Sequence, residues 1–514
     1  MILVIDFGSQ TTHLIARRLK EMGVKTKIIH PENVCRGIDQ TKARGIVLSG
    51  GPAGTYETNA PTVDRAIYNL DIPILGICYG FQLTTHLLGG SVVAGKKEYG
   101  PVIIKLKIKN QRSKILQGLP KKFVVWMSHG DSVIKLPKSF KIIGFSDEIP
   151  FAFVENTKKR IFGLQFHPEV EHTQYGSQIL RNFLDICGLK VGIKKGEEFR
   201  IKNLESGIKE IVGEKDYVIG AVSGGVDSAV AAALTVRAIG KRFIPVYVNN
   251  GLMREGTEEH VRRIFKQIGI KPIVVNVVGE MLKKLKEITN SEQKRKIIGN
   301  FYIKIFEKEM RKLKAKNLPV KYLLQGTIYS DVIESQGTKH SSKIKSHHNV
   351  GGLPKKMKLK LLEPVRNFYK DEVRRIGRKL NLPEDFINKQ PFPGPGYAVR
   401  IRGEVTKERL RMEKKADEIV LSELEKANLL SKVFLSFPVM TNAFSTAVKG
   451  DGRQFGEVVA IRVVDSRDIM TSNWTRLPYE ILQRISSRIV NEVPGVSRVV
   501  YDITTKPPAT MEWE

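Results

Sequence analysis

One pattern occurs twice in this chain and constrains its fold more than any other feature. A short apolar run leads into a glycine-rich turn, and a helical pattern follows. The first copy has its run at residues 73–77 and GICYG at 76–80, and the second has its run at 217–222 and SGGVDS at 223–228. Short apolar runs that alternate with helices are typical of buried parallel strands. We therefore expect two doubly wound α/β domains.

Further apolar runs place the expected domain boundaries. Runs at 2–5 and 45–49 belong to the first domain, and runs at 243–248 and 272–277 belong to the second. A Lys/Glu-rich stretch from 194 to about 209 resembles a connector, so the first domain is expected to span residues 1–190.

The PFPGPG segment at 391–396 cannot continue a helix or a central strand. It separates a second α/β domain, 191–390, from a small α+β domain, 391–514.

The cysteines and the hydropathy pattern narrow the class of protein. Only Cys35, Cys78 and Cys187 occur, an odd number at spacings that match neither a disulfide framework nor a zinc site. No run approaches the ~20 apolar residues that cross a membrane, and the start lacks a basic, then apolar, leader. We expect a cytoplasmic protein with no membrane partner.

The net charge of +32 would suit a nucleic-acid-binding protein. The lysines, however, are scattered among acidic residues along the whole chain, whereas a binding arm or stripe would concentrate them. We therefore expect no nucleic-acid partner, and anionic small substrates still benefit from the positive field.

The first chemical centre is predicted at Cys78. This cysteine lies at the bend between a buried strand and a helix, between Gly76 and Gly80, the arrangement of a nucleophile elbow. The helix N-terminus behind it favours a thiolate. The alternative, a small buried apolar residue, is the default for Cys35 and Cys187.

A base and an oxyanion hole complete this centre. In FGLQFHPEV a strand is expected to end at His167, and an extended chain would place Glu169 on the same face, where it orients the imidazole. Backbone amides of Gly51, in SGGP, and of Tyr79 are the expected donors to an oxyanion. The alternative for His167 is a hydrogen-bonded core histidine.

The motifs GICYG, SGGP and HPEVEHT together resemble the class I glutamine amidotransferase domains, which hydrolyse glutamine through a thioester. The resemblance assigns catalysis to Cys78, His167 and Glu169. It also places Gln82 and, in MSHGD, His129 and Asp131 near the glutamine.

The second chemical centre is predicted at SGGVDS, where a strand, a glycine turn and a helix present free amides to a phosphate. The segment is not a Walker A loop, because no GxxxxGK[ST] is present. It resembles the loop of ATP pyrophosphatases, which split ATP into AMP and pyrophosphate with Mg²⁺. The expected ATP-binding residues are Ser223, Gly224, Gly225, Val226, Asp227 and Ser228.

Two further expectations attach to this centre. Asp227 is the candidate Mg²⁺ ligand, and the alternative is that Asp227 and Ser228 only cap the helix. Asn249 and Gly251, after the next strand, are expected to hold adenine or ribose, although the family pattern has an acid at position 249.

The remainder of the chain resembles the glutamine-hydrolysing GMP synthases in long segments: KRKIIGNF, QGTIYSDVIES, IKSHHNVGGLP, PFPGPGYAVR, GDGRQF and SRVVYDITTKPPATMEWE. The resemblance implies glutamine, ATP and XMP as substrates, amination of an adenylated XMP, and a homodimer formed by the C-terminal domain. It assigns XMP contacts to Arg295, Asp451, Lys506 and Glu512. Gln390 departs from the family pattern, which has His there.

Two other interpretations stay open from the sequence. An RNA-thiolating or carbazoylating enzyme uses a similar ATP loop, but the attached glutaminase and the lack of paired cysteines argue against it. A degenerate regulatory protein would need broken catalytic residues, and both centres are intact.

Overall fold

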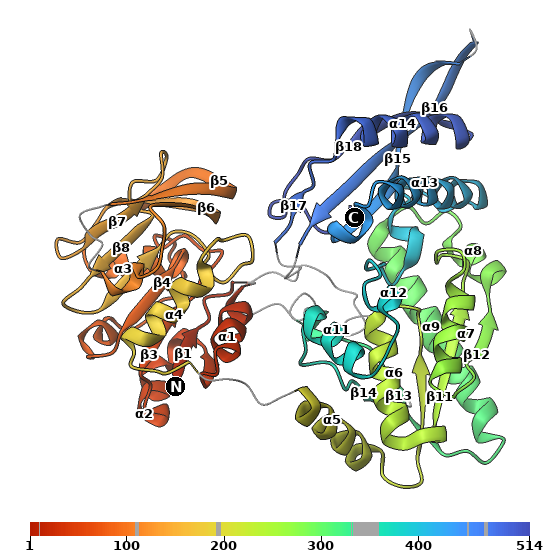
Figure 1. Cartoon of the computed structure of the whole chain (residues 1–514), viewed down its shortest axis with the longest axis horizontal. Coiled ribbons are helices and arrows are strands. Elements are labelled where there is room, and N and C mark those ends of the chain that lie inside the picture. Colours follow the sequence, from red (N-terminus) through yellow and green to blue (C-terminus); the bar gives the residue numbers. More distant parts are fainter. Residues whose placement is uncertain are drawn as a thin grey trace. The chain divides into compact units, whose positions relative to one another are not determined.

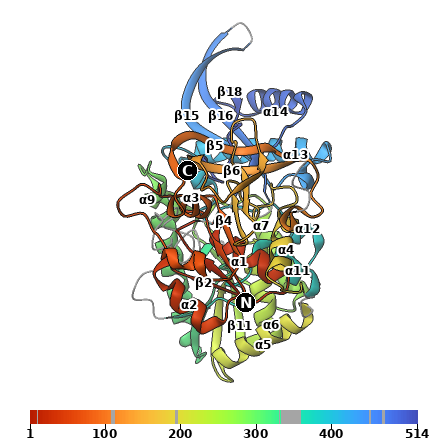
Figure 2. The same ribbon diagram turned by 90° about the vertical axis from the view of Figure 1, so that its left-hand side faces the viewer.

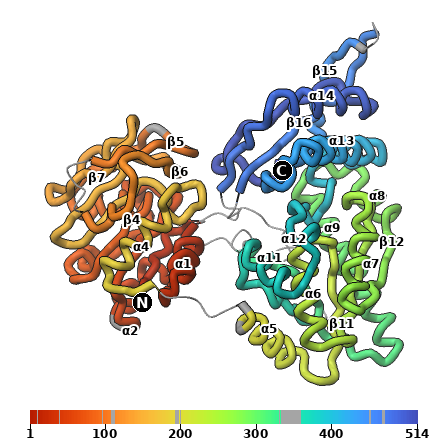
Figure 3. The backbone as a smooth tube through the Cα atoms, viewed as in Figure 1, coloured from red at the N-terminus to blue at the C-terminus, as the bar shows by residue number. Residues whose placement is uncertain are grey.

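The computed structural model describes every residue except 10, 108–112, 192–196, 330, 333–358, 450–451, 467–470 and 514. The described residues form two compact units, one built mainly on Met1–Lys194 and the other on most of the rest (Figures 1 and 3). The second unit contains most of both later predicted domains, so the division of the chain into three domains remains a prediction. No helix in the described residues is long and apolar enough to cross a membrane.

A nine-stranded sheet forms the centre of the first unit, in the order β2-β1-β3-β4-β9-β8-β7-β5-β6. Its parallel half contains β1 (Ile2–Ile5), β2 (Thr26–Ile29), β3 (Gly45–Leu48), β4 (Ile74–Ile77) and β9 (Ile161–Leu164). Its antiparallel half contains β5 (Ser91–Leu106), β6 (Lys122–Lys135), β7 (Lys141–Phe145) and β8 (Phe153–Asn156). The loops after β3, β4 and β9 meet at one edge, because these strands are parallel neighbours.

The helices of the first unit follow its parallel strands. They are α1 (Thr12–Glu21), α2 (Val34–Thr41), α3 (Tyr79–Leu87) and α4 (Gly176–Ile186), with short 3-10 turns at Pro31–Asn33, Arg65–Asn69 and Lys114–Leu116. Helix α4 buries Ile179, Leu180, Phe183 and Leu184, the spacing of one helical face.

The second unit contains a five-stranded parallel sheet, ordered β12-β11-β10-β13-β14. Its strands are β10 (Tyr217–Ala221), β11 (Phe243–Asn249), β12 (Ile273–Asn276), β13 (Val320–Leu324) and β14 (Lys360–Leu362). The chain builds outward from β10 to β12 and then returns to β13 on the other side of β10. The strand order therefore reverses between β10 and β13, the position where doubly wound sheets bind ligands.

The helices around this sheet are α5 (Glu197–Val212), α6 (Val226–Ile239), α7 (Thr257–Gln267), α8 (Val278–Leu285), α9 (Ser291–Lys314), α11 (Lys370–Lys379) and α12 (Glu384–Ile387), with 3-10 turns at Gly240–Arg242 and Gly396–Val399. Most of the expected connector is the helix α5 itself. The many lysines and glutamates of α5 give it the composition of a linker. Its apolar residues Ile201, Ile208 and Val212 nevertheless recur at helical spacing and are buried, so this segment packs as a helix.

The C-terminal part of the second unit combines helices with a mainly antiparallel sheet. Its elements are α13 (Lys407–Lys426), a 3-10 turn at Leu430–Lys432, β15 (Leu435–Lys449), β16 (Gly452–Asp465), β17 (Asn473–Trp474), α14 (Tyr479–Glu492) and β18 (Val496–Tyr501). The β15–β16 hairpin extends past α14 (Figure 2). The predicted fold class is confirmed: two doubly wound α/β parts and a smaller α+β part.

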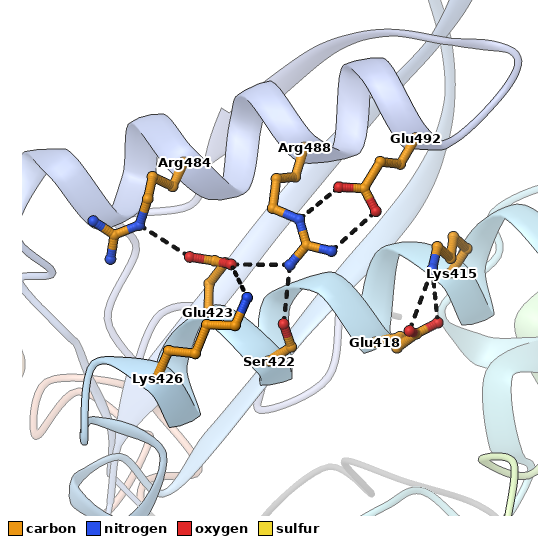
Figure 4. A network of polar contacts seen from close by, with 8 residues as sticks. All are labelled: Lys415, Glu418, Ser422, Glu423, Lys426, Arg484, Arg488 and Glu492. Atoms are coloured by element: carbon orange, nitrogen blue, oxygen red, sulfur yellow. Dashed lines mark hydrogen bonds and ion pairs between the residues drawn. The ribbon is translucent and has the colours of Figure 1, made fainter.

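Helices α13 and α14 are joined by an ion-pair network (Figure 4). The Glu423 carboxylate accepts hydrogen bonds from Arg484 Nε at 3.0 Å, Arg488 Nη1 at 2.9 Å and Lys426 Nζ at 3.2 Å. Burial opposes ionisation of Glu423, but these hydrogen bonds lower its pKa to about 2. The network therefore stays charged at neutral pH and holds the two helices together.

Candidate active sites

Cys78 lies at the sharp turn between β4 and α3, with φ of 50° and ψ of −108°. Such a conformation is strained for a residue other than glycine, by about 1–3 kcal/mol. The flanking glycines allow close packing here: a Cβ on Gly76 would lie 2.8 Å from the backbone of Gly80, and one on Gly80 would lie 2.3 Å from the carbonyl oxygen of Leu48. The turn therefore presents the cysteine at the edge where β3, β4 and β9 end.

His167 and Glu169 lie beyond β9, the strand next to β4. His167 Nδ1 is 2.7 Å from Glu169 Oε1, and the two side chains are 7% and 0% exposed. The expectation that a strand ends at His167 is wrong, because β9 ends at Leu164. The two side chains meet through a turn after the strand and not along an extended chain.

The protonation of His167 is set by its neighbours. Burial alone would lower the pKa of the imidazole, but the Glu169 carboxylate and a hydrogen bond with Cys78 raise it well above its ordinary value. An imidazolium is therefore favoured beside the sulfur, and it can stabilise a thiolate.

Two polar groups lie next to the thiol, one on β6 and one just after β9. Cys78 Sγ lies 3.6 Å from the carbonyl oxygen of Ser128 on β6, and Gln165 Nε2 lies 3.8 Å from Sγ. Sequence reasoning missed Gln165, and only its place between β9 and His167 could have indicated it.

The expected oxyanion donors lie side by side. A Cβ on Gly51 would be 3.2 Å from Tyr79 Cγ, and one on the preceding Gly50 would be 3.1 Å from His167 Cε1. Neither the Gly51 nor the Tyr79 amide donates a hydrogen bond within the described residues. Both remain available for a developing negative charge.

The three residues expected near glutamine form one cluster. The carbonyl oxygen of Asp131 lies 2.9 Å from Gln82 Nε2 and 3.0 Å from His129 Nδ1. Gln82 Nε2 also lies 3.4 Å from Gln165 Oε1, which links the cluster to the thiol. Burial lowers the pKa of His129 to about 4, so its ring is neutral near pH 7.

The second centre lies in the loop between β10 and α6. Gly224 has φ of 79°, and a Cβ there would lie 2.7 Å from Thr257 Cγ2. Ser228 Oγ donates to the carbonyl oxygen of Gly225 at 2.9 Å and lies 3.3 Å from Ser223 Oγ. The serine side chains therefore stabilise the loop at the α6 N-terminus, where Val226 is the first helical residue.

The loop after β13 closes this centre from the other side of the strand-order reversal. A Cβ on Gly326 would lie 2.6 Å from the Ser228 backbone nitrogen. On the opposite side, Asn249 Oδ1 accepts the Gly251 amide at 3.2 Å, and Asn249 Nδ2 lies 3.4 Å from Glu258 Oε2. The side-chain amide of Asn249 accepts one hydrogen bond and donates the other, whereas an ionised acid at this position could only accept. Asn249 therefore suits both contacts.

Asp227 has a cationic partner that sequence reasoning missed. Lys370 Nζ, from the first turn of α11, lies 2.5 Å from Asp227 Oδ2, and Asp227 Oδ1 is buried without a hydrogen-bond partner. No group of three or more His, Cys, Asp or Glu within the described residues could hold a metal ion by itself. A buried carboxylate oxygen without a hydrogen-bond partner fits Mg²⁺, which commonly takes one or two carboxylates together with substrate phosphates.

The four residues expected to contact XMP lie in different surroundings. Arg295, on α9, and Lys506 are 7% and 8% exposed, and Asp451 lies outside the described residues. Glu512 makes a forked ion pair with Arg400, whose Nε and Nη2 lie 3.1 and 3.2 Å from its carboxylate oxygens. Their roles toward XMP remain predictions.

Arg400 connects the C-terminal segment to the region beside the Ser223–Ser228 loop. Its Nη1 lies 3.8 Å from Asp417, and Asp417 accepts two hydrogen bonds from Arg254, at 2.6 and 3.0 Å. Arg254 belongs to the segment after β11, and the Arg400 side chain is fully buried over the ring of Phe437. A continuous charged network therefore runs from Glu512 to the loop beside the second centre.

Gln390, the other departure, has a structural role here. Its Oε1 accepts from both the amide and the hydroxyl of Ser436 at 3.0 Å, and its Nε2 lies 3.4 Å from the carbonyl oxygen of Leu430. Its amide thereby holds the segment before PFPGPG against the start of β15.

Comparisons with known proteins agree with both centres. The family model for glutamine amidotransferase class-I matches residues 3–187, that for NAD synthase matches 200–312, and that for the GMP synthase C terminal domain matches 422–513.

Relatives extend the similarity to the full length. Proteins named GMP synthase [glutamine-hydrolyzing] are 48% identical in Aquifex aeolicus and 49% identical in both Nitratiruptor sp. and Campylobacter jejuni. Each match covers 100% of this chain and 99% of the relative. The chain therefore belongs to the family of glutamine-hydrolysing GMP synthases.

Proposed function

We propose that this chain converts XMP, glutamine and ATP into GMP, glutamate, AMP and pyrophosphate. One observation carries the proposal: a chain similar along its whole length to glutamine-hydrolysing GMP synthases keeps both a buried Cys78–His167–Glu169 arrangement and a glycine-rich Ser223–Ser228 loop at the N-terminus of α6. The first centre supplies ammonia and the second activates its acceptor.

In the glutaminase half-reaction, the Cys78 thiolate attacks the side-chain amide carbon of glutamine. The Gly51 and Tyr79 amides stabilise the oxyanion, and the His167 imidazolium gives its proton to the departing ammonia. Water, deprotonated by the neutral His167, then hydrolyses the thioester to glutamate. Glu169 keeps the imidazole in the required orientation.

In the synthetase half-reaction, a carbonyl oxygen of XMP attacks the α-phosphorus of ATP, and pyrophosphate leaves. Ammonia then adds to the activated carbon and AMP departs. The amides at the α6 N-terminus and the Lys370 ammonium are suited to hold the outer phosphates. Asp227 is the residue that would hold Mg²⁺, and the ion would supply neutralisation of negative charge on the phosphates.

The remaining assignments extend this proposal. Arg295, Asp451, Lys506 and Glu512 would contact XMP, and a cytoplasmic location suits an enzyme of nucleotide synthesis.

A homodimer through the C-terminal region is supported by the apolar tip of the β15–β16 hairpin. There Phe444, Val448 and Phe455 are 53%, 75% and 72% exposed, and the two phenylalanine rings stack at 5.6 Å. Sedimentation at several concentrations tests the dimer.

The test of the function mixes the protein with XMP, Mg-ATP and glutamine labelled with ¹⁵N in its side-chain amide. We expect labelled GMP, AMP and pyrophosphate in equal amounts. Formation of ADP, or GMP without the label, would contradict the proposal.

A further inference from the structure

A hydrogen bond at the rim of the first centre joins the loop after β3 to strand β6. The Tyr56 hydroxyl donates to Asp131 Oδ1 at 2.9 Å, although the Tyr56 side chain is 52% exposed. This bond raises the pKa of the Tyr56 phenol, because an ionised phenolate would lose it and repel the carboxylate. The phenol therefore stays a donor to Asp131 near neutral pH.

The loop is shaped to make this contact. A Cβ on Gly54 would lie 2.8 Å from Tyr56 Cζ and 3.0 Å from Asp131 Oδ2. The Tyr56 ring and the Asp131 carboxylate can therefore pack this closely only because residue 54 has no side chain. The Gly54 amide donates to Glu57 Oε1 at 3.0 Å, which fixes the turn that carries Tyr56. The same loop begins with Gly50 and Gly51, the residues beside His167 and Tyr79.

The other end of the contact is fixed relative to the thiol. The Asp131 carbonyl oxygen is held by the buried side chains of Gln82 and His129, and Gln82 connects through Gln165 to Cys78 Sγ. The Asp131 carboxylate makes no ion pair within the described residues, and its one side-chain donor there, Tyr56, is neutral. It therefore keeps acceptor capacity for a cation near the thiol.

We propose that Tyr56 is a positioning residue that orients the Asp131 carboxylate toward the α-ammonium group of the amido donor. The inference rests on the proposed function, because it identifies that donor as glutamine. The Tyr56–Asp131 contact then favours an amino acid amide over an amide of equal length that lacks the amino group. The contact also joins the loop that contains Gly51 to strand β6.

The test compares Tyr56→Phe with Tyr99→Phe, which removes another exposed tyrosine hydroxyl, in β5 of the same unit. Ammonia release is measured with XMP and Mg-ATP present, using glutamine and glutaramate, the analogue without the α-amino group. Tyr56→Phe is expected to lower kcat/KM for glutamine about 10-fold, mainly through KM, and that for glutaramate less than about 2-fold. Asp131→Asn should lower the glutamine value about 100-fold.

Each outcome decides between the two proposals. Loss of selectivity for glutamine in Tyr56→Phe, with Tyr99→Phe like the wild type and equal melting temperatures, supports the positioning role. Equal losses on both amides, or no loss at all, overturn it while leaving the proposed function intact. A wild-type protein that releases no ammonia from glutamine overturns the proposed function and the role of Tyr56 with it.

Discussion

The two chemical centres are organised in different ways. In the first, thiol, imidazole and carboxylate are buried, the imidazole is already hydrogen-bonded to the carboxylate, and Cys78 is held in a strained turn. In the second, the loop amides are ordered, but Asp227 is paired with Lys370 and not with a ligand. Covalent catalysis needs its protein groups aligned before the substrate arrives. In a nucleotide-binding site, charged side chains can stay paired with each other until the ligand binds and replaces one of the partners.

The largest expected effect separates the two centres completely. Cys78→Ala should lower glutamine-dependent GMP synthesis about 10⁴-fold or more, because no other group can form the thioester. Synthesis from free ammonium should continue, as measured by GMP formation at high ammonium concentration. Cys35→Ala is the control, because Cys35 is exposed and not buried as the sequence predicted. If Cys78→Ala lost both activities, the division between the centres would be wrong.

A smaller effect should follow from loosening the first centre. Glu169→Gln removes the carboxylate that raises the pKa of His167, so the titration midpoint of the imidazole should move downward. At neutral pH less imidazolium then supports the thiolate, and kcat/KM for glutamine should fall about 100-fold. NMR titration of His167 with parallel kinetics tests this. An unchanged midpoint would mean that Glu169 does not control the charge of the histidine.

A change at the second centre should affect glutamine-dependent and ammonium-dependent synthesis alike. Lys370→Ala removes a cation beside the phosphate loop, so pyrophosphate release should fall about 30-fold with either glutamine or ammonium. Lys379→Ala, at the exposed end of the same helix, should behave like the wild type. A normal kcat/KM for ATP in Lys370→Ala would show that the pair with Asp227 is only structural.

The smallest expected effect concerns stability in the second unit. Both carboxyl oxygens of Glu413 are buried without hydrogen-bond partners, and burial, together with Asp417, raises the pKa of Glu413 well above its ordinary value. A carboxyl with a raised folded-state pKa loses its contribution to stability as pH rises above the unfolded-state value. Glu413→Gln should therefore raise Tm more at pH 8 than at pH 5.

Thermal unfolding of Glu413→Gln is compared with that of Glu418→Gln, an exposed position on the same helix (Figure 4). The prediction assumes that Glu413 is neutral in the folded protein and ionises on unfolding at pH 8. An equal Tm difference at both pH values would contradict this assumption.

Apolar runs bounded by turn residues predicted the parallel strands closely. The expected runs 2–5, 45–49 and 217–222 correspond to β1, β3 and β10 within one residue. These strands are buried on both faces, so their sequences read as continuous apolar runs. The antiparallel strands β5 to β8 were not predicted, because half-exposed strands such as β6 mix polar and apolar residues.

Some residues of the candidate sites could likewise be predicted from local sequence, and others could not. Glycines next to Cys78 and Ser223 indicated backbone turns, since only close packing or a positive φ needs them there. Gln165, Lys370 and Tyr56 carry no such local signal. Lys370 is 143 residues away from Asp227 along the chain, and only the folded sheet brings α11 to the Ser223–Ser228 loop.

The forked pair between Arg400 and Glu512 has a practical consequence for anyone who handles this protein. Removing the final three residues would take both hydrogen bonds to Glu512 from a fully buried guanidinium and leave it only the more distant carboxylate of Asp417, a costly change in a folded interior. Affinity tags and fluorescent fusions are therefore better attached ahead of Met1. A variant truncated before Glu512 should lose thermal resistance, whatever the truncation does to catalysis.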